Sequence, residues 1–125
     1  MSQALVAKLQ AASTEYQKLQ TDLGNAVDAR TRLDAQLSEN EQVKAEFAKL
    51  TPSNTVYKLI GPTLMPQDQT EAKGNVNTRI EFIQSEIKRV EGQLKEFEAK
   101  SEQKKNEIVE LQTVIQQSQQ GEAPA

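Results

Sequence analysis

Apolar residues recur along the first fifty residues at alternating steps of four and three. The series is Leu5, Leu9, Ala12, Tyr16, Leu19, Leu23, Ala26, then Arg30, Leu33 and Leu37, and, less strictly, Val43, Phe47 and Leu50. A period of about 3.5 residues is typical of a coiled-coil seam, in which apolar side chains form one stripe along a helix. Thr51-Pro52 then disfavours helix, because the residue before a proline avoids helical geometry. The pattern predicts a helix over residues 3–50.

A second series with the same period occupies the other half of the chain. It consists of Val76, Ile80, Ile83, Ile87, Val90, Leu94 and Phe97, then polar Ser101 and Lys104, then Ile108, Leu111 and Ile115. Asp68 precedes this series and can accept hydrogen bonds from the first free amides, while Glu71 follows three residues later, as in a capping box. The sequence therefore predicts a second helix over residues 69–118. Residues 119–125, which end in Gly, Ala and Pro, are predicted to form a disordered tail.

The two predicted helices have similar lengths of about 70 Å at the usual helical rise, and a short segment joins them. This arrangement predicts an antiparallel two-helix coiled coil in which positions that sum to about 121 lie opposite each other. Ser101 and Lys104 would then face residues 17–21 of the first helix. Polar residues in a seam can set the register of a coil and oppose mispairing. Alternatively, they loosen the coil at the end distant from the connector.

The connecting segment predicts a β-hairpin over residues 55–66. Thr55–Ile60 is rich in β-branched and aromatic residues, Gly61-Pro62 is a turn dipeptide, and residues 63–65 can return as a second strand before Pro66 stops it. Both faces are mostly apolar, and a lone two-stranded hairpin is marginal in water. We therefore expect the hairpin to join strands of other subunits in an intersubunit β-barrel, and the alternative is a cap over its own coil. The predicted assembly residues are Val56, Tyr57, Leu59, Ile60, Leu64 and Met65.

Composition excludes several classes of function. Only 36% of the 125 residues are hydrophobic and 4% are aromatic, which does not favour a conventional globular core. The net charge is −3 and the basic residues are dispersed, so nucleic acid is not an expected partner. The chain has no His, no Cys and no glycine-rich phosphate loop, so we expect neither an enzyme nor a metal or cofactor site. No run of 18 apolar residues and no signal-like N-terminus occur, so neither a membrane nor an export role is expected.

The hairpin and the start of the second helix resemble a known family. VYKLIGPTLMPQ and EAKGNVNTRIEFIQSEIKR, set between two heptad helices, resemble the beta-type subunits of prefoldin, in which a single hairpin joins the helices. The resemblance implies one beta-type domain over residues 1–125. It also implies a cytoplasmic heterohexamer of two alpha-type and four beta-type subunits. Such a complex captures unfolded actin, tubulin and other clients without ATP and delivers them to the cytosolic chaperonin.

Family members contact clients near the free ends of their coils, and no motif marks these contacts. Geometry alone assigns the predicted client-binding residues Leu5, Val6, Leu9, Val109, Leu111, Val114 and Ile115, named here the tip residues. Val6, Val109 and Val114 lie off the seam, so they either widen it locally or form an apolar clamp in water. The remaining alternative is a tethering coiled coil without chaperone activity, which would explain the helices but not the apolar hairpin.

Overall fold

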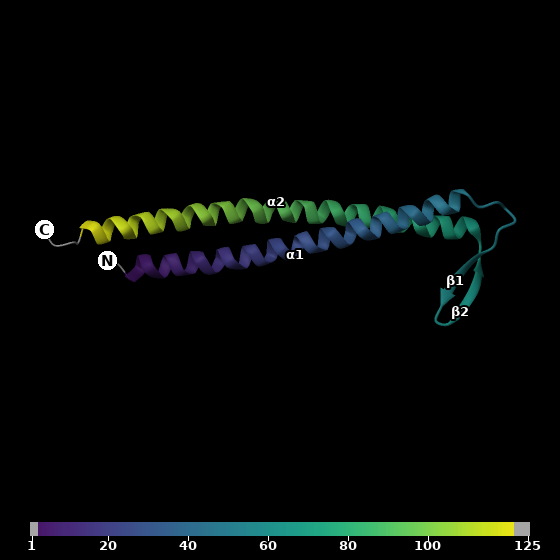
Figure 1. The fold of residues 1–125 in the computed structure, drawn as a ribbon, viewed down its shortest axis with the longest axis horizontal. Helices are drawn as coiled ribbons and strands as arrows, with labels where there is room; N and C mark the ends of the chain where they lie inside the picture. Colours follow the sequence, from purple (N-terminus) through teal and green to yellow (C-terminus); the bar gives the residue numbers. More distant parts are fainter. Residues whose placement is uncertain (1–2, 122–125) are drawn as a thin grey trace. The chain divides into compact units, whose positions relative to one another are not determined.

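The computed structural model describes residues 3–121 and consists of two long helices with an antiparallel hairpin between them (Figure 1). In chain order the elements are α1 Gln3–Ala48, β1 Val56–Ile60, β2 Thr63–Gln67 and α2 Gln69–Gly121. The chain packs as two compact units. We name Ala29–Val90 the hairpin unit, and Met1–Asp28 with Glu91–Ala125 the terminal unit. The predicted fold class, mainly helical with a single hairpin connector, is confirmed.

Helix α1 ends at Ala48, two residues earlier than the sequence predicted. Its last turn tightens, because the amides of Lys49 and Leu50 bond to carbonyls three residues back, at 3.1 and 3.2 Å. The chain then turns, and the Asn54 side chain accepts a hydrogen bond of 2.7 Å from the Thr51 amide. The sequence predicted the end of the helix to within two residues but missed this final tight turn.

Helix α2 begins as the sequence predicted, with Asp68 as its N-cap. The Asp68 carboxylate accepts a 3.0 Å hydrogen bond from the Glu71 amide, and its carbonyl accepts the first helical bond from Ala72 at 2.9 Å. The other end was predicted wrongly, since the helix continues to Gly121 and residues 119–121 are helical. The glutamines of residues 116–120 are good helix formers, and no breaker interrupts them. The remainder of the predicted tail, residues 122–125, lies outside the described residues.

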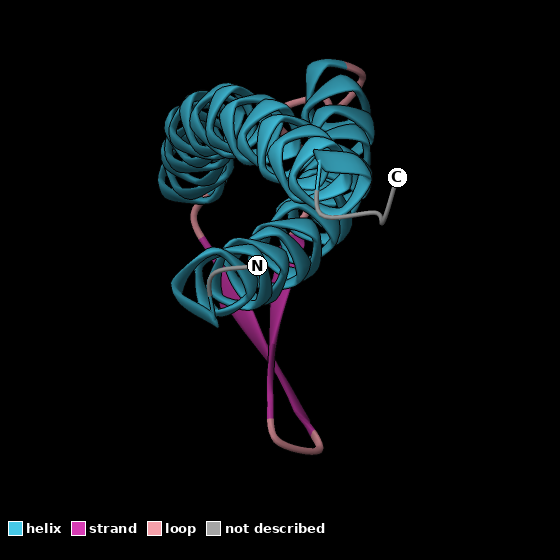
Figure 2. Cartoon of the chain, turned by 90° about the vertical axis from the view of Figure 1, so that its left-hand side faces the viewer, coloured by secondary structure: helices cyan, strands magenta, loops and turns pink. Residues whose placement is uncertain are grey.

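The hairpin has the predicted Gly61-Pro62 turn and is strongly twisted, as two-stranded ribbons usually are (Figure 2). Its second strand is longer than predicted, because β2 continues through Pro66 to Gln67. Pro66 lies opposite Tyr57. By the alternation of an antiparallel ladder, this pair does not exchange backbone hydrogen bonds, so the missing N–H of proline leaves the hairpin intact.

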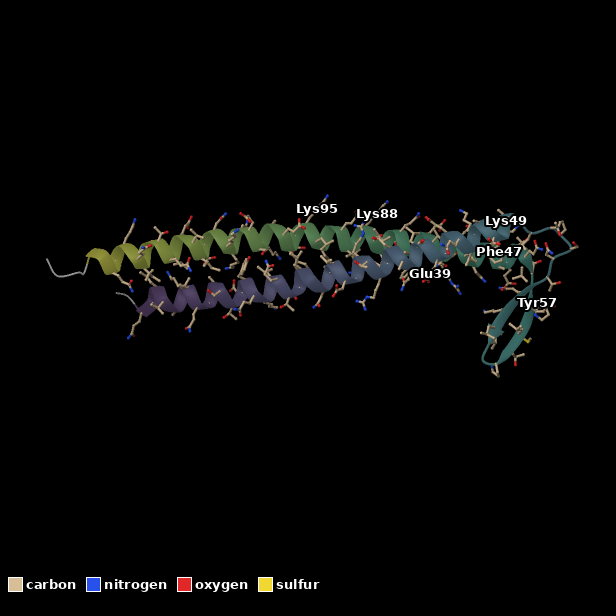
Figure 3. The ribbon with its side chains drawn as sticks, viewed as in Figure 1. Glu39, Phe47, Lys49, Tyr57, Lys88 and Lys95 are labelled. Atoms are coloured by element: carbon tan, nitrogen blue, oxygen red, sulfur yellow. The ribbon has the colours of Figure 1, made fainter. Side chains whose placement is uncertain are left out.

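The seam of α2 is buried throughout the hairpin unit. The buried side chains are Ala72, Val76, Ile80, Ile83, Ile87 and Val90, each 2–9% exposed. Helix α1 lies beside the start of this series, since one cavity of about 220 Å³ is lined by Lys44 and Phe47 from α1 and by Lys73, Val76 and Asn77 from α2. Glu39 and Lys88, in contrast, extend into solvent (Figure 3). The heptad pattern of α2 therefore separates buried from exposed faces as predicted, whereas Val43, which was predicted for the seam of α1, is 44% exposed.

Candidate functional site

The hairpin exposes apolar side chains on both faces. The strand register pairs Tyr57 with Pro66 and Leu59 with Leu64, so these residues share one face. That face, named here the leucine face, carries no charged residue. Leu59 is 67% exposed and Leu64 62%, and Tyr57 projects from β1 into solvent (Figure 3). Among residues 3–121, no segment covers Leu59 or Leu64.

The opposite face of the hairpin is mixed. It carries Val56, Lys58 and Ile60 from β1 and Thr63, Met65 and Gln67 from β2. Ile60 and Met65 are exposed, whereas Val56, next to the loop, is half-buried. Of the residues predicted for assembly, the structure therefore leaves all but Val56 in water.

The hairpin is attached firmly to the start of α2. The Gln69 side-chain amide donates hydrogen bonds to the carbonyls of Thr51 and Asn54, at 2.8 and 2.7 Å. These bonds hold the loop that enters β1 against the first turn of α2. The apolar strands are thus presented by an ordered base within the hairpin unit.

In the terminal unit the tip residues are less buried than the α2 seam of the hairpin unit. Leu5, Leu9, Leu111 and Ile115 are half-buried. The off-seam residues Val6, Val109 and Val114 are 41–52% exposed, as the sequence predicted. Val6 and Val114 also satisfy the predicted antiparallel register, since their numbers sum to 120. The predicted register therefore puts both at one level of the unit, one on each helix, and the contacts of Gln20 with Ser101 and of Glu15 with Lys104 follow that register within a few residues.

A polar layer interrupts the seam of the terminal unit. Ser101 is buried and accepts a hydrogen bond from the Gln20 side chain of α1. Lys104 forms ion pairs with Glu15 of α1, at 2.6 Å, and with Glu107 of its own helix, at 3.0 Å. These hydrogen bonds to Glu15 and Glu107 raise the pKa of Lys104. Gln20 lies within the predicted facing segment of residues 17–21, whereas Glu15 lies just beyond it.

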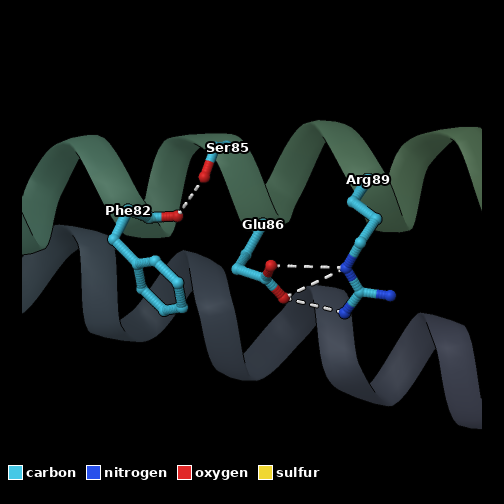
Figure 4. Close-up of polar contacts among 4 residues, drawn as sticks. All are labelled: Phe82, Ser85, Glu86 and Arg89. Atoms are coloured by element: carbon cyan, nitrogen blue, oxygen red, sulfur yellow. Dashed lines mark hydrogen bonds and ion pairs between the residues drawn. The ribbon is translucent and has the colours of Figure 1, made fainter.

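The structure exposes one aromatic residue, Phe82, that the sequence pattern did not single out. Phe82 lies on α2 in the hairpin unit, is 63% exposed, and stands beside a fork-like ion pair between Glu86 and Arg89 (Figure 4). The Arg89 hydrogen bond lowers the pKa of the Glu86 carboxyl. Phe82 falls between the seam positions Ile80 and Ile83, and that offset alone could have predicted its exposure.

Within residues 3–121 there is no group of three or more acidic, His or Cys side chains that could hold a metal ion. Over the same residues, no helix is long and apolar enough to cross a membrane.

The two helices and their exposed hairpin define a class of coiled-coil subunit that is completed by other chains. The chain belongs to the prefoldin family, because the family model described as prefoldin subunit matches residues 10–121. Prefoldin subunit 6 of mouse is 43% identical over 99% of this chain and 98% of its own length. The human prefoldin subunit 6 is 42% identical over 100% of this chain and 97% of its own.

The solved structures agree on the fold. The crystal structure of the prefoldin beta subunit from Thermococcus strain KS-1 matches with a TM-score of 0.74, at 21% identity, over 81% of this chain and 89% of that one. The predicted resemblance to beta-type subunits is confirmed, and the full-length relatives named above identify the eukaryotic subunit six as the similar beta-type subunit. Membership makes the chain a co-chaperone subunit that assembles with other prefoldin subunits, in a family not known for catalysis.

Proposed function

We propose that the chain is one subunit of a heterohexameric, ATP-independent co-chaperone of the cytoplasm. The complex contains alpha-type and beta-type prefoldin subunits. It captures unfolded proteins such as actin and tubulin at the tip residues and delivers them to the cytosolic group II chaperonin. Cytoplasmic location, clients and chaperonin follow from the family resemblance. The division of labour within the chain follows from its exposed apolar surfaces.

The exposed leucine face of the hairpin is the observation that carries the proposal. Burial of apolar surface contributes about 25 cal/mol per Å², so a face with Tyr57, Leu59 and Leu64 in water favours association. Strands from other subunits can cover this face and pair the free strand edges at the same time, as a barrel does. A tethering coil needs only a polar turn at this place, so the hairpin argues against that alternative.

The tip residues supply the second half of the proposal. Val6, Val109 and Val114 remain exposed although the adjacent seam is occupied. Apolar contacts are non-directional, so scattered valines and half-buried leucines suit an unfolded chain of any sequence. The chain has no glycine-rich phosphate loop, which agrees with capture that does not use ATP.

The test of client capture replaces two exposed valines, one from each helix. In Val6→Ser/Val114→Ser we expect the assembled complex to suppress aggregation of denatured actin several-fold less well, because each change removes exposed apolar surface. Val27→Ser is the matched control, since Val27 is 48% exposed in the same unit but is not a tip residue. Exposed substitutions of this kind change folding stability little. Unchanged suppression by the double variant, or an equal loss in the control, would refute the assignment of the tips.

Delivery has a separate test. A tagged chain purified from its own cytosol is expected to bring other prefoldin subunits and the chaperonin with it. Prefoldin subunits without chaperonin would remove the delivery step and leave the chaperone subunit in place. Neither partner would contradict the whole proposal.

A further inference from the structure

The two outer edges of the hairpin differ in their backbone hydrogen-bonding groups. Gly61 has a φ of 59° and the ring of Pro62 fixes its φ near −65°, so the turn is of the II′ type that suits tight hairpins. In such a turn the Ile60 carbonyl accepts a hydrogen bond from the Thr63 amide. The register then assigns inward-facing backbone groups to the Ile60–Thr63, Lys58–Met65 and Val56–Gln67 pairs.

The intervening pairs turn their backbone groups outward. These pairs are Tyr57–Pro66 and Leu59–Leu64. On the β1 edge, Tyr57 and Leu59 each present one N–H and one C=O. On the β2 edge, Leu64 presents both groups, but Pro66 presents a carbonyl only. A neighbouring strand can therefore bond to two N–H and two C=O groups on the outer edge of β1. On the outer edge of β2 it finds two C=O groups but only one N–H, that of Leu64, because Pro66 has none.

We propose that the outer edge of β1 holds a strand of a neighbouring prefoldin subunit firmly along the full length of the hairpin, while the β2 edge, where Pro66 leaves Leu64 as the single outward donor, holds a neighbouring strand much less firmly. The inference rests on the proposed function, in which hairpins assemble the complex, and it specifies which edge of the hairpin pairs more firmly with a neighbouring subunit. The occupant is a β-strand of another prefoldin subunit, because only an extended backbone matches alternating N–H and C=O groups. The leucine face is continuous with this edge, since Tyr57 and Leu59 belong to both.

The direct test measures amide hydrogen exchange in the unmodified chain, free and assembled with purified alpha-type subunits. Assembly is expected to slow exchange at Tyr57 and Leu59 at least tenfold more than at Leu64. Equal slowing at the three amides, or greater slowing at Leu64, would overturn the edge assignment. Failure of the unmodified chain to assemble would instead refute the proposed function, so the two failures are distinguishable.

A matched pair of variants provides a second measurement. Leu59→Pro and Leu64→Pro change facing residues of the same pair, remove the same side chain, and delete only an outward N–H, so the internal ladder is retained in both. We expect Leu59→Pro to weaken binding to alpha-type subunits at least tenfold more than Leu64→Pro. Equal weakening, or the reverse order, would contradict the proposal. Because Leu64→Pro gives β2 a second proline and Leu59→Pro gives β1 its first, a general effect of proline on the hairpin would predict the larger loss for Leu64→Pro, the opposite of the order expected here.

Discussion

The hairpin unit and the terminal unit are built from the same two helices, yet they bury the seam of α2 differently, whereas the α1 seam residues Leu33, Leu37 and Phe47 of the hairpin unit are half-buried. In the hairpin unit the α2 seam from Ala72 to Val90 is almost inaccessible to water. In the terminal unit, Leu94, Phe97, Ile108 and Leu111 of the same helix are half-buried, and the buried residues are Ala12, Ala26 and Ser101. The heptad repeat alone therefore does not fix how tightly a coil closes. Along α2, the tightly buried stretch carries mainly Val and Ile, whereas in the half-buried stretch Leu94, Phe97 and Ile108 flank the polar Ser101 and Lys104.

This difference fits the two tasks proposed for the chain. Assembly requires that the hairpin be held in one orientation, and the hydrogen bonds of Gln69 together with the buried α2 seam provide that. Client capture requires apolar side chains that can be reached from water, and a half-buried seam leaves them available. The valines Val6, Val109 and Val114 of the terminal unit are exposed, whereas the isoleucines Ile80, Ile83 and Ile87 of the hairpin unit are buried.

The largest expected effect comes from opening the tight seam. In Ile83→Ala we expect the free energy of unfolding to fall by about 2–5 kcal/mol, because truncation of this buried isoleucine, 6% exposed, leaves a cavity. Ile115→Ala, at a half-buried position of the other unit, is expected to cost about 1 kcal/mol. Thermal unfolding of the assembled complex, followed by circular dichroism, measures both. Equal decreases in stability in the two variants would contradict the claim that the α2 seam is packed more tightly in the hairpin unit than in the terminal unit.

A smaller effect is expected from the polar layer. Ser101→Ala removes the hydrogen bond from Gln20, whose exposed side chain can bond to water instead. The net cost is therefore expected to stay below about 1 kcal/mol. Amide exchange over residues 94–108 reports this local change. A loss as large as that of Ile83→Ala would mean that the polar layer, and not the aliphatic seam, holds the coil together.

The smallest effect concerns surface ion pairs, which both units carry. Hydrogen bonds from Arg89 and Lys100 lower the pKa of Glu86 and of Glu96. A carboxyl with a lowered pKa stabilises the fold above its ordinary pKa, and that contribution is lost as the pH falls through the lowered value. In an NMR titration, Glu86 should therefore titrate at lower pH in the unmodified chain than in Arg89→Ala. Identical midpoints would show that this ion pair does not form in solution.

Most of the fold could be predicted because it depends on local patterns. The heptad series gave both helices and their register, which the contacts of Ser101 with Gln20 and of Lys104 with Glu15 bear out within a few residues. Asp68 was predicted as a cap from its place before the second series, and its bond to the Glu71 amide confirms it. Composition and period were sufficient for these features.

Two element ends were predicted wrongly, because the end of β2 depends on the strand register and residues 116–120 of α2 carry neither an apolar repeat nor a helix breaker. Pro66 was expected to end β2. The strand can include this proline because Pro66 lies opposite Tyr57, where no backbone N–H is needed, and only the three-dimensional register reveals that pairing. The extension of α2 to Gly121 lacks seam residues, so periodicity gave no reason to expect it. The roles of the tip residues and of the hairpin side chains stay predictions, since surface exposure permits binding but does not identify the partner.

The mass of the assembled protein tests the central claim most directly. The chain is mixed with alpha-type and other beta-type prefoldin subunits and measured by native mass spectrometry. A parallel sample carries a short Gly-Ser turn in place of residues 56–67. We predict a six-subunit complex that contains the unmodified chain, and no incorporation of the chain that lacks the hairpin. A chain that remains alone among its partners, or one that assembles equally well without the hairpin, would contradict the account.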